Sequence, residues 1–428
     1  MRSPRYLRYA LGIIALVYVV NYLDRQILAI LLPSIKSEFW LSDTALGLLA
    51  GPAFALFYAI LGVPIARLAD RISRRNIIAA SLALFSLATF ACGLAIQFAH
   101  LFLARVLTGI GEAGTGPAAQ SLISDLYPPK RRASAQAFYA AGLNVGIMVA
   151  FFGGGLIAEA YGWRVAFMAA GLPGFVLAAF VLLMLHEPTR GASEEREDKG
   201  QLPALSATTA FLLSQRSYRH IVLGTAMSAF SGYGLLAFIP SFLSRSHGLS
   251  TATIGTVFAL ILGVGGGVAT FVAGLLADRG AKRDVRWNMY VPVLGVLISL
   301  PFWPMFFLHR DTLTALLCAI IPASLASIYI GPCMAMIQGL SPLRMRATAA
   351  SLQLFFANVI GLGLGPWCIG IASDVLRPSL GQDSLRYALL IGVIPAILSA
   401  VSYWLAGRSL GDDMIRAKAF DQLGKAAG

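Results

Sequence analysis

Charged residues are scarce in this sequence. They make up 12% of its 428 residues, about half of the share that soluble domains carry. Hydrophobic residues make up 57%, and the mean hydropathy is +0.74. Such a composition excludes an ordinary soluble enzyme, a disordered protein and a nucleic-acid binder. The class that remains is an integral membrane protein.

Signals for disulfides, metals and bound cofactors are also missing. The four cysteines lie in apolar runs without metal-ligand spacing, so we interpret them as small core residues. The five histidines lie near the ends of apolar runs and have no metal spacing either. There is no phosphate-binding Walker loop and no dinucleotide fingerprint after a strand. We therefore expect no cofactor, no metal site and no enzymatic activity.

Apolar runs dominate the chain. A membrane-spanning helix needs about 20 mostly apolar residues. The first run follows three arginines, as in a signal peptide, but it is too long and lacks a small-residue cleavage site, so we expect a retained helix. Twelve runs meet the length requirement: about 10–33, 44–66, 76–97, 100–122, 134–157, 165–185, 219–243, 251–276, 288–308, 313–337, 347–371 and 385–407.

The net charge of +13 reflects the orientation of the chain in the membrane and does not indicate an acidic partner. With twelve spans, both ends of the chain lie on one side, and the linkers on that side hold all of the excess lysine and arginine. The positive-inside rule makes this side cytoplasmic. We expect a multi-pass protein of a bacterial-type inner membrane, with both termini cytoplasmic and no nucleic-acid partner.

One polar stretch, from Glu187 to about Leu202, separates six runs from six. It predicts an N-terminal bundle over 1–186, a cytoplasmic linker over 187–218, a C-terminal bundle over 219–407 and a cytoplasmic tail over 408–428. Twelve spans suffice for a functional monomer. The expected fold class is all-α, with twelve transmembrane helices in two pseudo-symmetric bundles.

The two halves repeat one motif. The segment at 66–75 (ARLADRISRR) aligns without gaps with the segment at 274–283 (GLLADRGAKR). A duplicated six-span unit is a transporter architecture, with the substrate site between the halves. The repeated loop resembles motif A of the major facilitator superfamily, although alanine and serine replace two of its glycines in the first copy. The resemblance implies alternating access by a rocker-switch movement of the two bundles.

Two further segments resemble the Spinster branch of that superfamily, whose members transport sphingolipids and lysolipids. They are the NYLDR stretch at 21–25 and the GEA stretch at 111–113. The first stretch also occurs in organic-anion symporters, so the pair carries the resemblance. It implies that the substrate is amphipathic and lysolipid-like.

Only four ionisable residues lie well inside the predicted spans: Asp24, Arg25, Arg105 and Glu112. Each costs about 2.5–3.5 kcal/mol at a helix centre, so such residues usually face a polar interior in pairs. Burial and a neighbouring arginine shift the proton affinity of a carboxyl group in opposite directions. We therefore predict Asp24 and Glu112 as proton-coupling residues, which makes the proton gradient the energy source.

The two arginines and Asn21 are predicted as charge partners or contacts to the substrate headgroup. Asn21 and Arg25 share a helical face, because they are four residues apart. A static ion-pair cluster is the structural alternative. All four charges lie in the N-terminal half, and the C-terminal half offers neutral groups such as Ser228 and Gln353. One polar wall and one apolar wall favour an amphipathic substrate, although the neutral groups could serve helix packing alone.

Three other functions stay open. Arg25 and Arg105 could clamp a small carboxylate in an organic-anion/proton symporter, and a multidrug exporter or a non-transporting membrane sensor could share the fold. Direction of transport and proton stoichiometry do not follow from the sequence. The motif A copies predict a gating role for their charged residues at the cytoplasmic helix ends, namely Asp70, Arg71, Arg74, Arg75, Asp278, Arg279, Lys282 and Arg283.

Overall fold

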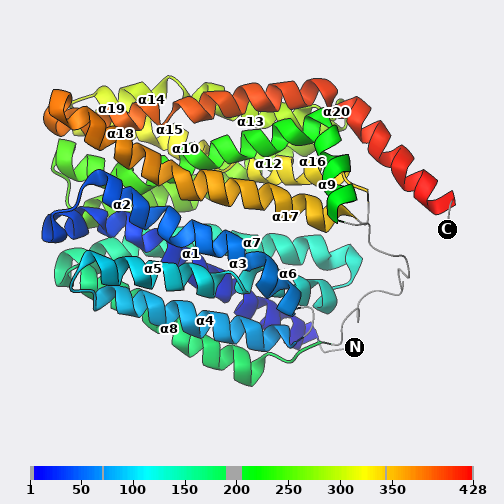
Figure 1. Ribbon diagram of the computed structural model, residues 1–428, viewed down its shortest axis with the longest axis horizontal. Coiled ribbons are helices and arrows are strands. Elements are labelled where there is room, and N and C mark those ends of the chain that lie inside the picture. The colour runs from blue at the N-terminus through cyan, green and yellow to red at the C-terminus, as the bar shows by residue number, and fades with distance from the viewer. Residues whose placement is uncertain (1–3, 70–71, 189–204, 343–344, 427–428) are drawn as a thin grey trace. The chain divides into compact units, whose positions relative to one another are not determined.

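Helices form all of the regular structure in the residues that the computed structural model describes, which are 4–69, 72–188, 205–342 and 345–426 (Figure 1). The expected all-α class is confirmed. Long runs of aliphatic side chains explain this outcome, because in an apolar solvent a helix satisfies every backbone N–H and C=O within its own segment.

The chain divides into two compact units, each of which is described by itself. The first unit holds the first eight helices and residues 237–264. Its helices are α1 (Pro4–Phe39), α2 (Asp43–Ala50), α3 (Pro52–Ala69), α4 (Arg74–Gly93), α5 (Phe98–Glu112), α6 (Thr115–Leu126), α7 (Pro129–Tyr161) and α8 (Trp163–Met184), followed by the end of α10 (Arg216–His247), α11 (Thr251–Phe258) and most of the π-helix η1 (Ala259–Gly265).

The second unit begins with α9 and the first part of α10, up to Leu236, and continues from Gly265. The last helix, α20, runs on through the predicted tail. The helices are α9 (Leu205–Ser214), α12 (Gly266–Ala281), α13 (Trp287–Ser299), α14 (Phe302–Leu308), α15 (Thr312–Leu325), α16 (Ile330–Gly339), α17 (Arg346–Phe356), η3 (Ala357–Leu364), α18 (Gly365–Leu380), η4 (Gly381–Asp383), α19 (Ser384–Ile391) and α20 (Ile394–Ala426).

Ten helical segments in the described part of the chain are long and apolar enough to cross a membrane. They include most of the predicted spans, and the segment Arg346–Ala417 covers the last two. The predicted span 100–122 is divided between α5 and α6, neither of which is long enough to be among the ten. The chain is therefore a multi-pass membrane protein.

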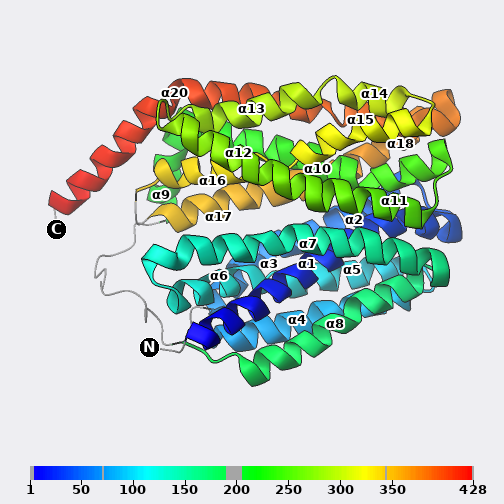
Figure 2. The ribbon, with the colours of Figure 1, turned by 180° about the vertical axis from the view of Figure 1, so that it is seen from behind.

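The first unit packs around α1. This helix lies against α7 and α8, and α4 lies against α5 and α8 (Figures 1 and 2). Aliphatic and aromatic side chains from α1, α4, α6, α7 and α8 form its core, with Leu82, Phe85 and Leu122 fully buried. Figure 2 shows α1 running between α7 on one side and α4 with α8 on the other. This position brings the charged residues of α1 into the interior of the unit.

Candidate functional site

Helix α5 carries two of the four buried charges, and glycines allow it to approach its neighbours closely. A Cβ atom on Gly109 would lie 2.4 Å from the Phe54 carbonyl oxygen of α3. A Cβ atom on Gly111 would lie 2.7 Å from the Phe85 amide nitrogen of α4. Helices without side chains at the contact can pack backbone to backbone. The two glycines therefore position Arg105 and Glu112 deep inside the unit.

Glu112 is the last residue of α5, and Arg25 of α1 reaches its carboxylate. The Nη2 atom of Arg25 donates to Oε2 of Glu112 at 2.7 Å. Both side chains are buried, so water screens their attraction little. The helix stops here because residues 113–114 form a turn before α6, and the Thr115 hydroxyl donates to the freed Glu112 carbonyl oxygen.

Asp24 forms the second buried pair. Its Oδ1 atom lies 3.9 Å from Nη1 of Arg105, which also points at the Asp24 carbonyl oxygen at 3.5 Å. The direct hydrogen bond to this carboxylate comes from the Thr89 hydroxyl of α4. Two acids and two bases thus neutralise one another across α1 and α5. This pairing fits the rule that charges inside a membrane protein are compensated.

Aromatic rings surround the guanidinium of Arg25. Its central carbon lies 5.2 Å from the ring centre of Tyr22 and 4.9 Å from those of Phe54 and Tyr58. The central guanidinium carbon of Arg105 lies 5.2 Å from the centre of the same Phe54 ring. A cation within about 6 Å of a ring face is attracted to it, and more strongly where water is excluded. Phe54 therefore contacts both arginines.

The structure brings together the four predicted interior charges. Asn21, one helical turn before Arg25 on α1, is buried, and its Nδ2 atom has no hydrogen-bond partner among the described residues. Sequence reasoning missed Thr89, Phe54 and Tyr58. A lone threonine or an aromatic residue in an apolar span resembles any packing residue, so only the fold identifies them.

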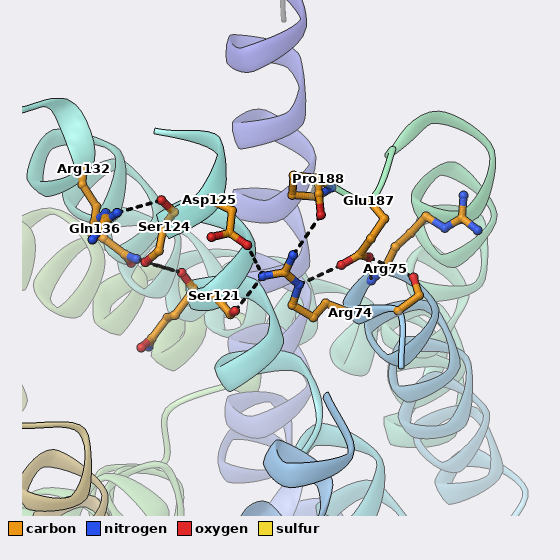
Figure 3. A network of polar contacts seen from close by, with 11 residues as sticks. Arg74, Arg75, Ser121, Ser124, Asp125, Arg132, Gln136, Glu187 and Pro188 are labelled. Carbon is orange, nitrogen blue, oxygen red and sulfur yellow. Dashed lines mark hydrogen bonds and ion pairs between the residues drawn. The ribbon is translucent and has the colours of Figure 1, made fainter. Parts of the chain in front are cut away.

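A second polar cluster surrounds Arg74 at the start of α4 (Figure 3). The guanidinium donates to Glu187 at 2.7 Å, to Ser121 at 2.8 Å and to the Pro188 carbonyl oxygen at 3.2 Å. It also pairs with Asp125 of α6. Arg74, the first residue of α4, thus connects the start of this helix to the end of α6 and to the segment that follows α8. Sequence reasoning named Glu187 as the start of the polar stretch between the halves, and it missed Asp125.

Glu187 is held by three donors. The Arg75 amide and the Ser73 hydroxyl both donate to its Oε2 atom at 2.9 Å, and Arg74 donates to Oε1. Burial alone would raise the pKa of Glu187, but these hydrogen bonds favour the charged form and bring its pKa below the ordinary value. The carboxylate is therefore charged at neutral pH.

The other motif A residues are placed differently. Asp70 and Arg71 lie outside the described residues. Asp278, Arg279, Lys282 and Arg283, at the end of α12 and just after it, are all exposed in the second unit. The gating role of these residues stays a prediction.

A third charged cluster lies at the opposite end of α1. Asp43, in the first turn of α2, is buried and accepts two hydrogen bonds from Arg245 of α10, at 2.7 and 2.9 Å. Lys36 of α1 donates to the same carboxylate at 2.5 Å. The pair of Asp43 and Arg245 joins residues 202 apart in sequence. Sequence reasoning missed it, because both residues lie just outside predicted spans.

The neutral polar groups of the second unit serve mostly helix packing. Ser228 lies 2.9 Å from the Tyr403 hydroxyl, and Ser231 donates to the Gly392 carbonyl oxygen at 2.9 Å. Gln353 is buried, and its Oε1 atom has no partner among the described residues. The predicted wall residue Ser228 and its neighbour Ser231 thus have partners within the unit, while Gln353 keeps an acceptor without a partner among the described residues.

Paired carboxylates and guanidiniums enclosed by apolar helices are typical of helical membrane transporters. The sequence model of the Major Facilitator Superfamily matches residues 14–366, and the chain belongs to this superfamily. It is 35% identical to an MFS-type efflux pump of Mycolicibacterium smegmatis, over 96% of this chain and 95% of that one.

Spinster proteins are also among its relatives, as the sequence predicted. The chain is 27% identical to the sphingosine-1-phosphate transporter SPNS2 of Mus musculus, over 96% of this chain and 79% of that one. A crystal structure of a bacterial homologue of the human lysosomal transporter Spinster, inward-facing and occupied, matches with a TM-score of 0.86. The identity is 30%, and the match covers 96% of this chain and 99% of that one.

Proposed function

We propose that this chain is a proton-coupled secondary transporter that moves an amphipathic, lysolipid-like substrate by rocker-switch alternating access. In this proposal twelve spans form two six-helix bundles in a bacterial-type inner membrane. Both termini lie in the cytoplasm, and the monomer is functional. The proton gradient supplies the energy.

The observation that carries this proposal is the double ion pair at the interior of the first unit. Asp24 and Glu112 are buried, and each lies beside one arginine. A buried carboxylate that loses its cationic partner gains affinity for a proton, and one that regains it releases the proton. A conformational change that separates Arg25 from Glu112 would therefore move a proton in step with access.

The relatives support the substrate class. One of them is named as a transporter of sphingosine-1-phosphate, a lipid with one polar end. The distribution of charge in this chain is consistent with such a molecule, since the cluster of charges belongs to the first unit and the second contributes neutral groups such as Gln353.

The charged clusters at the two ends of α1 support alternating access. The Arg74 cluster lies near the N-terminal end of α1, where the Tyr6 hydroxyl contacts residue His186 next to Glu187. The Asp43 cluster lies at the other end, beside Lys36. Ion pairs at both ends of a bundle can close one entrance while the other opens.

Proton flux into proteoliposomes tests the proposal. A lysophospholipid or a small organic acid is added under an imposed pH gradient, and the wild type is compared with Glu112→Gln and Asp24→Asn. We expect the lysophospholipid to evoke proton flux in the wild type and at least a tenfold smaller flux in each variant. Flux evoked only by the organic acid would favour the symporter, with Arg25 and Arg105 as a carboxylate clamp. Undiminished flux in both variants would refute the assignment of the proton carriers.

The match to an efflux pump favours one second candidate, a multidrug exporter. Both candidates use the same proton site, so the substrate decides between them. Extrusion of a cationic dye from energised inverted vesicles, without any response to lysophospholipid, would support the exporter. Competition between the dye and the lysophospholipid would indicate one shared site for amphipathic molecules.

A further inference from the structure

Thr89 occupies a position that the double ion pair does not explain. It lies on α4, and its side chain is fully buried. Its hydroxyl oxygen contacts two acceptors at once: the Phe85 carbonyl oxygen one turn earlier, at 2.9 Å, and Oδ1 of Asp24. Because a hydroxyl group has one proton to donate and two lone pairs to accept, it cannot donate to both.

The two protonation states of Asp24 resolve this conflict differently. When the carboxyl is charged, the Thr89 hydroxyl turns toward it and donates. The Phe85 carbonyl keeps its backbone bond within the helix. When the carboxyl holds a proton, it donates to the Thr89 oxygen, and the hydroxyl proton returns to the Phe85 carbonyl. One rotation about the C–O bond thus serves both states.

The other neighbours of Asp24 do not donate to its charged form. The Arg105 guanidinium stands at 3.9 Å, beyond hydrogen-bond distance, and the Oδ2 atom of Asp24 has no hydrogen-bond donor among the described residues. The Glu112 carboxyl is also a hydrogen-bonding neighbour of Asp24, but two carboxyls share a hydrogen bond only when one of them holds a proton. In a dry interior, a polar group without a partner is costly. The Thr89 hydroxyl is therefore the side-chain hydrogen-bond donor to this carboxyl in its charged state.

We propose that Thr89 is a positioning residue for Asp24, which reverses its donor role when the carboxyl gains or loses a proton and so keeps both states hydrogen-bonded. The inference deepens the proposed function and rests on it for its role in transport. The hydrogen bond itself, and the proton exchange at Asp24, can be measured without transport.

Other charged groups act on Asp24 as well. They are Arg105 and Glu112 from α5, and Cys92 from α4 is a further titratable neighbour. The other titratable groups on the helices around this site include Arg25 on α1, Asp43 on α2, Asp125 on α6, Tyr139 on α7 and Arg164 on α8. Asp125, Arg164 and Asp43 have partners of their own toward the ends of the helices. Arg105 and Glu112 are thus the charges that share the site with Thr89.

Three substitutions at Thr89 distinguish the hydrogen bonding of its hydroxyl group from the packing of its side chain. Thr89→Val keeps the shape and removes the hydroxyl, Thr89→Ala removes the hydroxyl with less risk of misfolding, and Thr89→Ser keeps it. The charged state loses more than the neutral state, because hydrogen bonds to charged groups are the stronger ones. We expect the pH midpoint of proton exchange at Asp24 to rise by about one unit in Thr89→Val and Thr89→Ala, and to stay near the wild-type value in Thr89→Ser.

Infrared titration of the purified full chain in liposomes measures this midpoint directly. The protonated carboxyl band that Asp24→Asn removes is assigned to Asp24, and its intensity is followed against pH. Thr108→Val is the matched control, because the Thr108 hydroxyl of α5 is equally buried and donates to the Ala104 carbonyl oxygen, with no carboxyl group as a partner among the described residues. It should leave the band and its midpoint unchanged.

The outcomes are distinct. An upward shift with Thr89→Val and Thr89→Ala, restored by Thr89→Ser, supports the inference. An unchanged midpoint in both hydroxyl-free variants overturns it, as does the absence of any titrating band from Asp24. If the shift is found while lysophospholipid-evoked proton flux in liposomes does not follow the same pH dependence, the relation of Thr89 to Asp24 stands and the proposed coupling fails.

Discussion

The guanidinium of Arg25 lies 2.7 Å from the carboxylate of Glu112, although 87 residues separate them in the sequence. The contact depends on close packing along α5, where the glycine at 111 leaves no side chain between that helix and α4. The same guanidinium is enclosed by three aromatic rings. Arg25 therefore has two kinds of partner, and the loss of either should leave a measurable trace.

A double-mutant cycle measures the interaction between Arg25 and Glu112. Removing one member of a buried ion pair leaves the other charge uncompensated and costs about 3–5 kcal/mol. We expect Arg25→Gln and Glu112→Gln each to lower the free energy of unfolding by an amount in this range, and the double variant to lose clearly less than the sum. Unfolding in mixed micelles with increasing dodecyl sulfate gives these values. Additive losses would show that the two side chains do not interact.

Phe54→Leu tests the aromatic partner. The substitution keeps an apolar side chain in the core but removes the ring that both arginines contact. Each cation–π contact contributes about 0.5–2 kcal/mol. We therefore expect a larger loss of stability than in Phe151→Leu, which removes a buried ring that packs against Phe258. Equal losses in the same micelle assay would assign Phe54 to packing alone.

The fold and the interior charges could be predicted largely from the sequence. In a membrane, apolar runs of the right length must be helices, and a charge inside such a run must find a partner. The free-energy cost of a charge inside the membrane was therefore enough to identify Asp24, Arg25, Arg105 and Glu112 as candidates. Which acid would pair with which base did not follow, because helical spacing fixes faces within one helix but not the contact between two.

Residues that carry no free-energy cost of insertion into the membrane could not be predicted in this way. The Thr89 hydroxyl can donate a hydrogen bond to the Phe85 carbonyl oxygen of its own helix, so nothing in the sequence distinguishes it from other hydroxyl residues in spans. Asp43 and Arg245 lie beyond the apolar runs, where charge is ordinary. The predicted gating residues show the same limit: Arg74 is deeply engaged in its cluster, whereas Arg279 is exposed in the second unit.

Acid should weaken the Arg74 cluster. The pKa of Glu187 lies below its ordinary value, so its contribution to stability is fully present above the ordinary carboxyl range and is lost as the pH falls through the lowered pKa. We expect Glu187→Gln to reduce the melting temperature by about 2–4 °C at neutral pH, and the difference from the wild type to vanish in acid. Asp383→Asn is the control, since Asp383 is exposed and pairs with Arg386 one helical turn away. A pH-independent difference would assign the effect of Glu187 to something other than its charge.

The pair of Asp43 and Arg245 should hold the end of α10 against α2. Asp43 is buried and binds both Arg245 and Lys36, so Asp43→Asn leaves two cations without their shared anion. We expect hydrogen–deuterium exchange at the amides of residues 41–50 and 243–252 to speed up about tenfold, the change that a loss of 1.4 kcal/mol produces. The exchanged variant Asp43→Arg with Arg245→Asp should recover part of the protection, because it restores one bridge of opposite charge.

Glu38→Gln is the control. It removes an ion pair with Arg164 at the same end of α1, in which both side chains are about a third or more exposed, and such surface pairs contribute little to stability. Equal acceleration in Glu38→Gln and Asp43→Asn would show that the pair of Asp43 and Arg245 stabilises these segments no more than a surface ion pair does.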